Sequence, residues 1–198
     1  MKQIPLRPVL IGLVILVAAV GLTRIVPSET PAQKSSATSG TFDGQCTKDH
    51  PGVSLVVDFG ADSGLSALVK CVRGFNVPDN SVSNQLSGWQ LFAQAGVKVV
   101  GTAEFSVGFV CRLAGYPSAA NQPCTSTPTY SEGHWAYFYA QADSGLPGQW
   151  SFSGAGSATH KPVCGGAEGW LFVKGDQVNG TTANQHPNPQ PEVFSCAP

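Results

Sequence analysis

Charged side chains are scarce in this chain. Only 12% of its 198 residues are Asp, Glu, Lys or Arg, and the formal net charge is −1. The sequence contains no cluster of basic residues, which argues against a nucleic-acid partner. Glycine and proline are abundant instead, at 23 and 15 residues. This composition is typical of a protein built from strands and turns rather than from helices.

The common catalytic motifs are also missing. The G-x-S-x-G motif is absent, since the nearest run, Gly154 to Ser157, does not have its register. No histidine lies in an H-x-x-x-H pattern, and no G-x-G-x-x-G occurs. Asp58 and Glu168 are the carboxylates that acid–base chemistry would use, but such residues more often bind backbone amides nearby. We therefore predict that the protein is not an enzyme and needs no cofactor.

The cysteine spacing argues against a metal site. No C-x2–4-C pair occurs among the six cysteines, so a zinc site is not favoured. An even number of cysteines indicates disulfides formed in an oxidising compartment. Many pairings are open to six cysteines, and we predict the sequential set: Cys46–Cys71, Cys111–Cys124 and Cys164–Cys196.

An apolar run near the N-terminus predicts export. Lys2 and Arg7 precede Val9–Leu22, a run of 14 residues. This run is shorter than the ~20 residues of a typical membrane-spanning helix and suits a signal peptide. Apolar residues on both sides would extend it to a tilted anchor. We predict residues 1–26 to be a signal anchor or a signal peptide. The rest then lies outside the cytoplasmic membrane, either secreted or as the extracytoplasmic part of a single-pass membrane protein.

Polar segments flank one predicted domain. Residues 27–45 are rich in Ser, Thr, Pro and Gly, which is typical of a flexible linker. Residues 46–173 contain the apolar strands and form one extracytoplasmic domain. Residues 174–198 make a Pro-, Asn- and Gln-rich tail, which a disulfide from Cys196 would dock on the domain.

The periodicity predicts several strands and one helix. Residues 83–96 form the helix, with Ser83 or Ser87 as its cap, an apolar stripe of Leu86, Trp89 and Ala93, and Gly96 after its end. The predicted strands are 53–60, the second half of 65–74, 97–105, 107–115, 134–142, 149–154 and 169–175. We therefore predict an α+β fold: a small mixed β-sheet with one main helix, stapled by disulfides.

Aromatic residues recur at a spacing of two in three predicted strands. They are Trp135, Tyr137, Tyr139, Trp150, Phe152, Trp170 and Phe172. One interpretation is that these rings are simply the core. The other interpretation is an aromatic surface that binds a ligand or a partner. One helix covers only one face of a sheet, so the other face is solvated, covered by the C-terminal tail, or used for binding.

Arg112 follows Cys111 in a predicted strand and has three interpretations. It pairs with Glu168 and braces the sheet, it lies exposed on a polar face, or its guanidinium binds a carboxylate or phosphate of a ligand.

Several of these segments together resemble a known family. They are VVDFG, KCV, SGWQLFAQAGV, GFVCRLAGYP with a following PC, HWAYFYAQ and EGWLF, in that order, from about Val53 to Val173. This order is similar to a family of secreted or membrane-tethered actinobacterial proteins, itself distantly similar to the transcobalamin-type C-terminal domain.

The resemblance implies a β-grasp-like fold and a non-enzymatic extracytoplasmic role. The protein would bind a vitamin-like ligand such as cobalamin, or would assist an energy-coupling-factor type transporter. The site residues implied by the resemblance and by the aromatic pattern are Trp135, Tyr137, Tyr139, Trp150, Trp170, Arg112 and Glu168. Cys164 and Cys196 are additional to the four cysteines of the family, which implies that they pair with each other. The alternative is a structural cell-envelope protein whose aromatic residues are core only.

Overall fold

The computed structural model describes residues 40–76, 85–143, 148–175 and 185–196. The predicted signal segment, residues 1–26, and most of the predicted linker lie outside these ranges. Within the described ranges, no helix is long and apolar enough to cross a bilayer.

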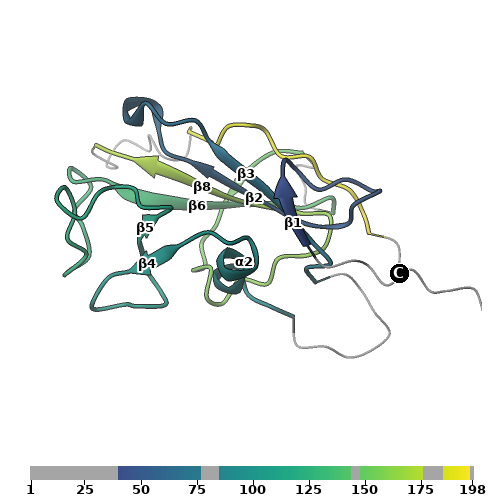
Figure 1. The fold of residues 1–198 in the computed structure, drawn as a ribbon, viewed down its shortest axis with the longest axis horizontal. Helices are drawn as coiled ribbons and strands as arrows, with labels where there is room; N and C mark the ends of the chain where they lie inside the picture. The colour runs from purple at the N-terminus through teal and green to yellow at the C-terminus, as the bar shows by residue number, and fades with distance from the viewer. Residues whose placement is uncertain (1–39, 77–84, 144–147, 176–184, 197–198) are drawn as a thin grey trace, which may run out of the picture. The chain divides into compact units, whose positions relative to one another are not determined.

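One six-stranded sheet forms the body of the fold (Figure 1). Its strands, in spatial order, are β1 (Gly40–Asp43), β3 (Leu68–Arg73), β2 (Gly52–Asp58), β8 (Ala167–Val173), β6 (His134–Ala140) and β7 (Ser151–Phe152). The central strands β2 and β8 pair in parallel, and every other neighbouring pair is antiparallel. Both central strands are buried almost throughout, as is usual for a parallel pair in the middle of a sheet. The predicted α+β class with a mixed sheet is confirmed.

Two predicted strands do not join this sheet. β4 (Val99–Gly101) and β5 (Val110–Leu113) form a separate two-stranded sheet, and both are shorter than predicted. The register shifts after Val100, and the chain then turns back on itself, with the Thr102 amide donating to the Phe109 carbonyl. This bulge and turn end the ladder early.

One α-helix occurs in the described ranges, together with the short 3₁₀ helix η1 (Ala61–Ser63). The helix, α2, spans Gly88–Gln94 and begins at a capping box of Ser87 and Gln90. Gly96 follows it in a left-handed conformation, as predicted. Of the two caps considered, Ser87 is the one used, and Ser83 lies outside the described residues.

The predicted stripe on the helix is confirmed for two of its three members. Leu86 and Trp89 are half-buried and pack against the larger core, whereas Ala93 is exposed. The most buried positions, Gly88, Leu91, Phe92 and Ala95, were missed because the first of them is a glycine, which carries no apolar side chain to count.

The side of the sheet that carries α2 holds the larger core. α2 and the β4–β5 pair lie on the same side (Figure 1). They bury Leu91 and Phe92 of the helix and Leu113 of β5 against the sheet. The sheet contributes Val53, Leu55, Val57, Trp135, Tyr137, Trp170 and Phe172 to this core.

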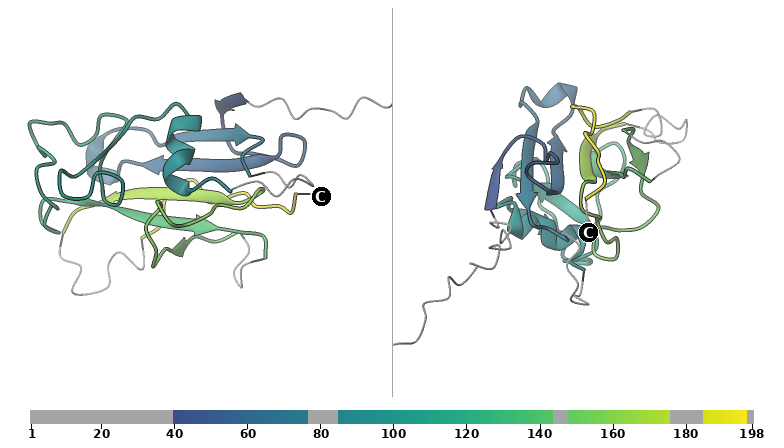
Figure 2. Two further views of the ribbon diagram at one scale, coloured as in Figure 1. Left: turned by 90° about the horizontal axis from the view of Figure 1, so that it is seen from below. Right: turned by 90° about the vertical axis from the view of Figure 1, so that its right-hand side faces the viewer.

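The opposite side is covered in part by the C-terminal segment. Phe138, Leu171 and Trp150 form a second buried cluster there. The Trp150 indole donates a hydrogen bond to the Pro189 carbonyl, and the Asn188 amide donates to Asp58. Figure 2 shows the described tail, residues 185–196, running beside β8. Of the three possibilities for the face without the helix, coverage by the tail is therefore the one found for this part of the sheet.

All three predicted disulfides are confirmed: Cys46–Cys71, Cys111–Cys124 and Cys164–Cys196. The first joins the segment before β2 to β3, the second holds the loop after β5, and the third docks the tail as predicted. Their sequence separations are 25, 13 and 32 residues. In the chain-entropy account, each loop closure stabilises the fold by roughly 3–4 kcal/mol.

The C-terminal boundary of the predicted linker, residues 27–45, is wrong. Gly40–Asp43 belongs to the folded domain, because it forms β1 at the edge of the sheet. Phe42 packs against the cluster of Cys46, Cys71 and Phe194. The polar composition hid this strand, because a single aromatic residue provides its anchor.

Candidate functional site

The predicted aromatic surface is divided between the two faces of the sheet. Trp135 and Tyr137 of β6 pair with Phe172 and Trp170 of β8 and lie in the core beneath α2. Phe92 of the helix is 5.4 Å from Trp170, ring centroid to ring centroid. These rings are therefore packed under the helix, and they do not form an open contact surface.

The register of β7 places Phe152, and with it Trp150 just before the strand, on the opposite face. Phe152 pairs directly with Phe138, so it shares the side of Phe138 rather than that of Tyr137. Trp150 accordingly lies in the second cluster, and its six-membered ring would contact any side chain added at Gly169. Trp150 thus contributes to the packing of the tail, and the prediction that it joins the other rings on one face is wrong.

A cavity opens beside the buried part of this aromatic group. Its volume is about 660 Å³, and segments 108–110, 127–130 and 153–157 enclose it together with β6 and β8. Trp135, Tyr137 and Trp170 contribute to its wall. Tyr130 and Phe152 also line it and are about half exposed.

The aromatic wall is held rigidly by ring-to-ring contacts. Tyr137 stacks on Trp170, with centroids 4.5 Å apart and planes inclined by 20°. Trp135 meets Phe172 edge to face at 5.3 Å. Both pairs are directly opposite each other in the β6–β8 ladder. Such cross-strand pairs stabilise the sheet and fix the orientation of the wall.

Two buried polar groups of the cavity-lining residues lack a hydrogen-bond partner among the described residues. They are the Trp135 indole nitrogen and the Ser157 hydroxyl. Trp135 is 6% exposed and Ser157 is 1% exposed. Buried polar groups in proteins are nearly always paired, so these two are exceptions within the described ranges.

Glu168 holds the hydroxyl end of the Tyr137 side chain by a hydrogen bond. It is 2% exposed, and its Oε2 accepts the hydrogen bond of the Tyr137 hydroxyl. His160 Nε2 lies 3.3 Å from Glu168 Oε1. The His160 carbonyl accepts the amide of Gly88, which ties this group to the start of α2. We name Tyr137, Glu168 and His160 the buried acid cluster.

Burial and pairing shift the titration of this cluster. Burial raises the pKa of Glu168, although the nearby His160 imidazole opposes it. The nearby Glu168 carboxylate raises the pKa of His160 against the effect of partial burial. Burial, with the adjacent carboxylate, raises the pKa of the Tyr137 phenol far above its ordinary value. Tyr137 therefore stays a neutral donor to Glu168. Neither Glu168 nor His160 lines the cavity, so this geometry assigns them the positioning of Tyr137.

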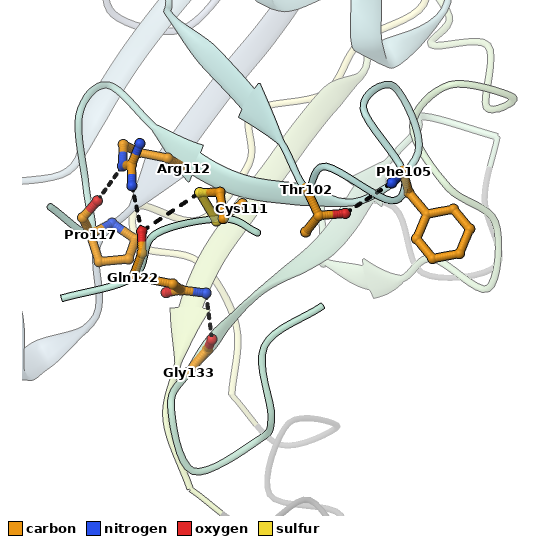
Figure 3. The surroundings of a disulfide bond; sticks show 8 residues. Thr102, Phe105, Cys111, Arg112, Pro117, Gln122 and Gly133 are labelled. Atoms are coloured by element: carbon orange, nitrogen blue, oxygen red, sulfur yellow. Dashed lines mark hydrogen bonds between the residues drawn. A yellow bond between two sulfur atoms is a disulfide. The ribbon is translucent and has the colours of Figure 1, made fainter. Parts of the chain in front are cut away.

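Arg112 does not pair with Glu168. Its Nε donates to the Pro117 carbonyl at 2.6 Å and one terminal nitrogen donates to the Gln122 carbonyl at 2.5 Å (Figure 3). Gln122 donates in turn to the Gly133 carbonyl just before β6. Arg112 thus braces the loop around the Cys111–Cys124 disulfide, and the predicted ion pair with Glu168 is wrong.

The remaining predicted positions are placed as follows. Tyr139 stands on the same face as Tyr137 but packs on His160, at 5.1 Å between ring centroids, and does not line the cavity. Asp58 accepts the Gly60 amide, as the turn interpretation predicted. Among the predicted binding residues, Trp135, Tyr137 and Trp170 are therefore the ones that meet at the cavity.

The sequence did not predict three residues of the cavity and of the buried acid cluster. Ser157 and His160 lie in a loop after β7 that has no periodicity. Gly88 carries no side chain that would mark it as a contact residue. The only signal was the run of small residues from Gly154 to Ser157, which marks a loop that can approach other backbone closely.

Comparisons with protein-family models, with curated proteins and with solved structures return no match for this chain. The β-grasp-like assignment and the resemblance to transcobalamin-type domains therefore stay predictions. In the described ranges, no three His, Cys, Asp or Glu side chains are grouped so that they could hold a metal ion.

Proposed function

We propose that the domain is a non-enzymatic extracytoplasmic binding module that takes a small molecule into the aromatic cavity. The observation that carries this proposal is the wall itself: three buried rings, Trp135, Tyr137 and Trp170, meet at one concave site. Apolar and aromatic walls with a few placed polar groups are typical of small-molecule sites, whose volumes run from ~300 to ~1,000 Å³. The cavity, at about 660 Å³, is of this size.

Two further observations support the proposed compartment and the proposed fold family. The three disulfides are typical of proteins that fold in an oxidising compartment. The partial strand order β3-β2-β8-β6, with a parallel central pair and a helix on one face, supports a β-grasp-like topology. By the resemblance, a vitamin-like ligand or a neighbouring vitamin transporter remains the proposed partner. The volume favours a ligand of modest size over a whole corrinoid, and cobalamin serves as a comparison ligand.

The experiment uses the indole N–H signals of the four tryptophans in a nitrogen–proton NMR spectrum, each assigned by a Trp→Phe variant. A ligand in the cavity shifts the signals of Trp135 and Trp170, which line it. The signals of Trp89 and Trp150 stay unchanged, because neither residue lines the cavity. A panel of small vitamins and neutral aromatic compounds is titrated, with cobalamin included.

Two variants locate the binding. A Cβ added at Gly154 meets no other atom within 4 Å, so the side chain of Gly154→Leu starts in open space at the lining of the cavity. Gly40→Leu is the matched control, because Gly40 is equally open and does not line the cavity. Binding weakened by Gly154→Leu and unchanged by Gly40→Leu supports the proposal. If no ligand of the panel moves the Trp135 and Trp170 signals, the proposal is overturned.

The alternative is a structural cell-envelope protein, and one observation favours it. Trp135 and Trp170 are only 6% and 4% exposed, as expected of residues that serve the core alone. In that case no ligand binds, and Trp135→Ala unfolds the domain.

A further inference from the structure

The lining of the aromatic cavity includes no Asp, Glu, Lys or Arg. Its titratable members are Tyr130, His134 and Tyr137. Burial lowers the pKa of His134, which favours its neutral form. A charged group that entered the cavity would lose its hydration without gaining an opposite charge, at a large cost in free energy. The part of a ligand that enters the cavity is therefore uncharged.

The polar side chains of the lining offer a ligand few hydrogen bonds. The hydroxyl groups of Thr129, Tyr137 and Ser153 are engaged within the protein. The Trp135 indole nitrogen and the Ser157 hydroxyl are closed to solvent, so a ligand does not reach them. The surface that a ligand does reach is mainly apolar. Contact with this surface, rather than polar pairing, has to supply the binding energy.

Exposed apolar side chains continue this surface at the border of the cavity. Tyr130 lines the cavity and is about half exposed. Phe105 is equally exposed and lies beside the lining residue Gly108, because a Cβ added at Gly108 would be 3.6 Å from the Phe105 Cβ. Val107, also half exposed, directly precedes Gly108. We name Phe105, Val107 and Tyr130 the apolar rim.

The apolar rim holds three of the five large apolar side chains that are exposed in the described ranges. Phe152 is not counted in it, although it lines the cavity, because its ring packs on Phe138 at the opposite face of the sheet. Apolar residues that gather on a surface mark a contact site in soluble domains. A compact ligand that fills only the cavity would leave the rim in water, whereas a longer apolar chain would cover both.

We propose that the ligand is an uncharged molecule with a flexible apolar chain, which fills the cavity and continues over the apolar rim. This inference rests on the proposed function and names the ligand class of its site. The charged residues next to the rim in the sequence, Glu104 and Glu132, are both acidic and exposed. They disfavour an anionic bilayer surface. We therefore assign the chain to a single dissolved molecule and not to a membrane.

The first test uses neutral alcohols of increasing chain length. Butanol, hexanol, octanol and decanol are titrated into the folded, disulfide-bonded protein, each below its solubility limit. Their affinities are measured from the indole signals of Trp135 and Trp170, which line the cavity. Unchanged signals of Trp89 and Trp150 exclude a general loss of structure. We expect the affinity to rise about fourfold for each methylene group added.

A second probe tests whether the end of the chain is buried. Octanediol, with one hydroxyl at each end, has the same chain as octanol. If the chain end lies in the cavity, the second hydroxyl loses its water without gaining a partner. We therefore expect octanediol to bind about tenfold more weakly than octanol.

A pair of surface variants tests the apolar rim. Phe105→Ser removes an apolar side chain of the rim that is 54% exposed. Leu65→Ser is the matched control, because Leu65 is 52% exposed and does not line the cavity. We expect Phe105→Ser to weaken decanol by about fivefold to tenfold and to leave butanol unchanged, since the short chain stays within the cavity. Leu65→Ser should change neither affinity.

The outcomes separate the ligand class from the proposed function. If the vitamin panel contains a ligand but the affinity of the alcohols does not depend on chain length, the ligand class is overturned and the binding function stands. Equal affinities of octanol and octanediol, or equal effects of Phe105→Ser and Leu65→Ser on decanol, also overturn the ligand class. If no alcohol and no member of the vitamin panel binds, both proposals are overturned together.

Discussion

The Tyr137 hydroxyl donates its hydrogen bond to the buried Glu168, across neighbouring strands β6 and β8. This single contact links the aromatic wall of the cavity to a carboxyl group that has almost no contact with solvent. Charged groups are rarely buried unless they are paired. Glu168 is paired twice, with Tyr137 and with His160, and both partners lie on the α2 side of the sheet. The buried acid cluster is thus a group of polar side chains within an otherwise apolar core.

Removing the carboxyl group should destabilise the fold strongly. Glu168→Ala leaves the Tyr137 hydroxyl without its acceptor and removes the charge that His160 faces, and we expect a loss of about 3 kcal/mol in the free energy of unfolding. Glu168→Gln keeps an acceptor of the same shape and should lose less. Urea denaturation measures both variants. Glu104→Ala is the control, since Glu104 is exposed. Equal, small losses in Glu168→Ala and Glu104→Ala would contradict the proposed burial of the pair.

The same cluster predicts a pH dependence of stability. The pKa of Glu168 is raised above its ordinary 4.5 and that of His160 above its ordinary 6.5, so the folded state binds more protons than the unfolded state. Each contribution is complete below the ordinary pKa and is lost as the pH rises through the raised value. The cluster should therefore stabilise the fold less and less as the pH rises from 4.5 through and beyond 6.5.

The comparison that isolates this effect is between the wild type and Glu168→Gln. The half-buried His134, whose pKa is lowered, gives the opposite slope near its ordinary 6.5, but it is present in both proteins. The unfolding free energy of the wild type, relative to that of Glu168→Gln, should decrease as the pH rises. If urea denaturation at each pH gives a constant difference between the two proteins, the buried acid cluster is not the source of the pH dependence.

The sequence predicted the parts of the site that depend on strand periodicity. The spacing of two in β6 and β8 correctly put Trp135, Tyr137 and Trp170 on one face, and the cysteine order correctly predicted the three disulfides. Periodicity did not determine the face of Trp150, because β7 is only two residues long and its register is set by the pairing of Phe152 with Phe138.

The acid cluster could not be predicted for a different reason. Glu168 follows two glycines and an alanine and precedes a third glycine in GGAEGW, a sequence typical of a turn, yet the strand begins at Ala167. Its partner His160 comes from a loop without a pattern. Such contacts depend on how the loop after β7 folds under α2, which is a tertiary relationship without a local signal.

Gly88 should not tolerate a side chain. A Cβ there would lie 2.8 Å from the Tyr137 hydroxyl and 3.0 Å from Glu168 Oε2. Alanine normally stabilises a helix relative to glycine by about 1 kcal/mol. We expect Gly88→Ala to reverse this sign and to destabilise the fold by about 1–3 kcal/mol, because the buried acid cluster has to move. Thermal unfolding measures it, with Gly40→Ala as the control at an open position. An increase in stability in Gly88→Ala would contradict the close approach of α2 to the cluster.

The Cys164–Cys196 disulfide should hold the tail over the second cluster. Its loop closes 32 residues, so its removal by the double Cys→Ser change should lower the free energy of unfolding by about 3–4 kcal/mol in the chain-entropy account. The tail contacts of Trp150 with Pro189 and of Gly169 with Pro187 should then loosen. Limited proteolysis should cleave residues 185–196 of the variant faster than those of the wild type, and Trp150 emission should move to longer wavelength. Because Trp135 and Trp170 lie on the other side of the sheet, their indole signals should keep their positions. Protection of the tail equal to that of the wild type would show that its apolar contacts suffice without the disulfide.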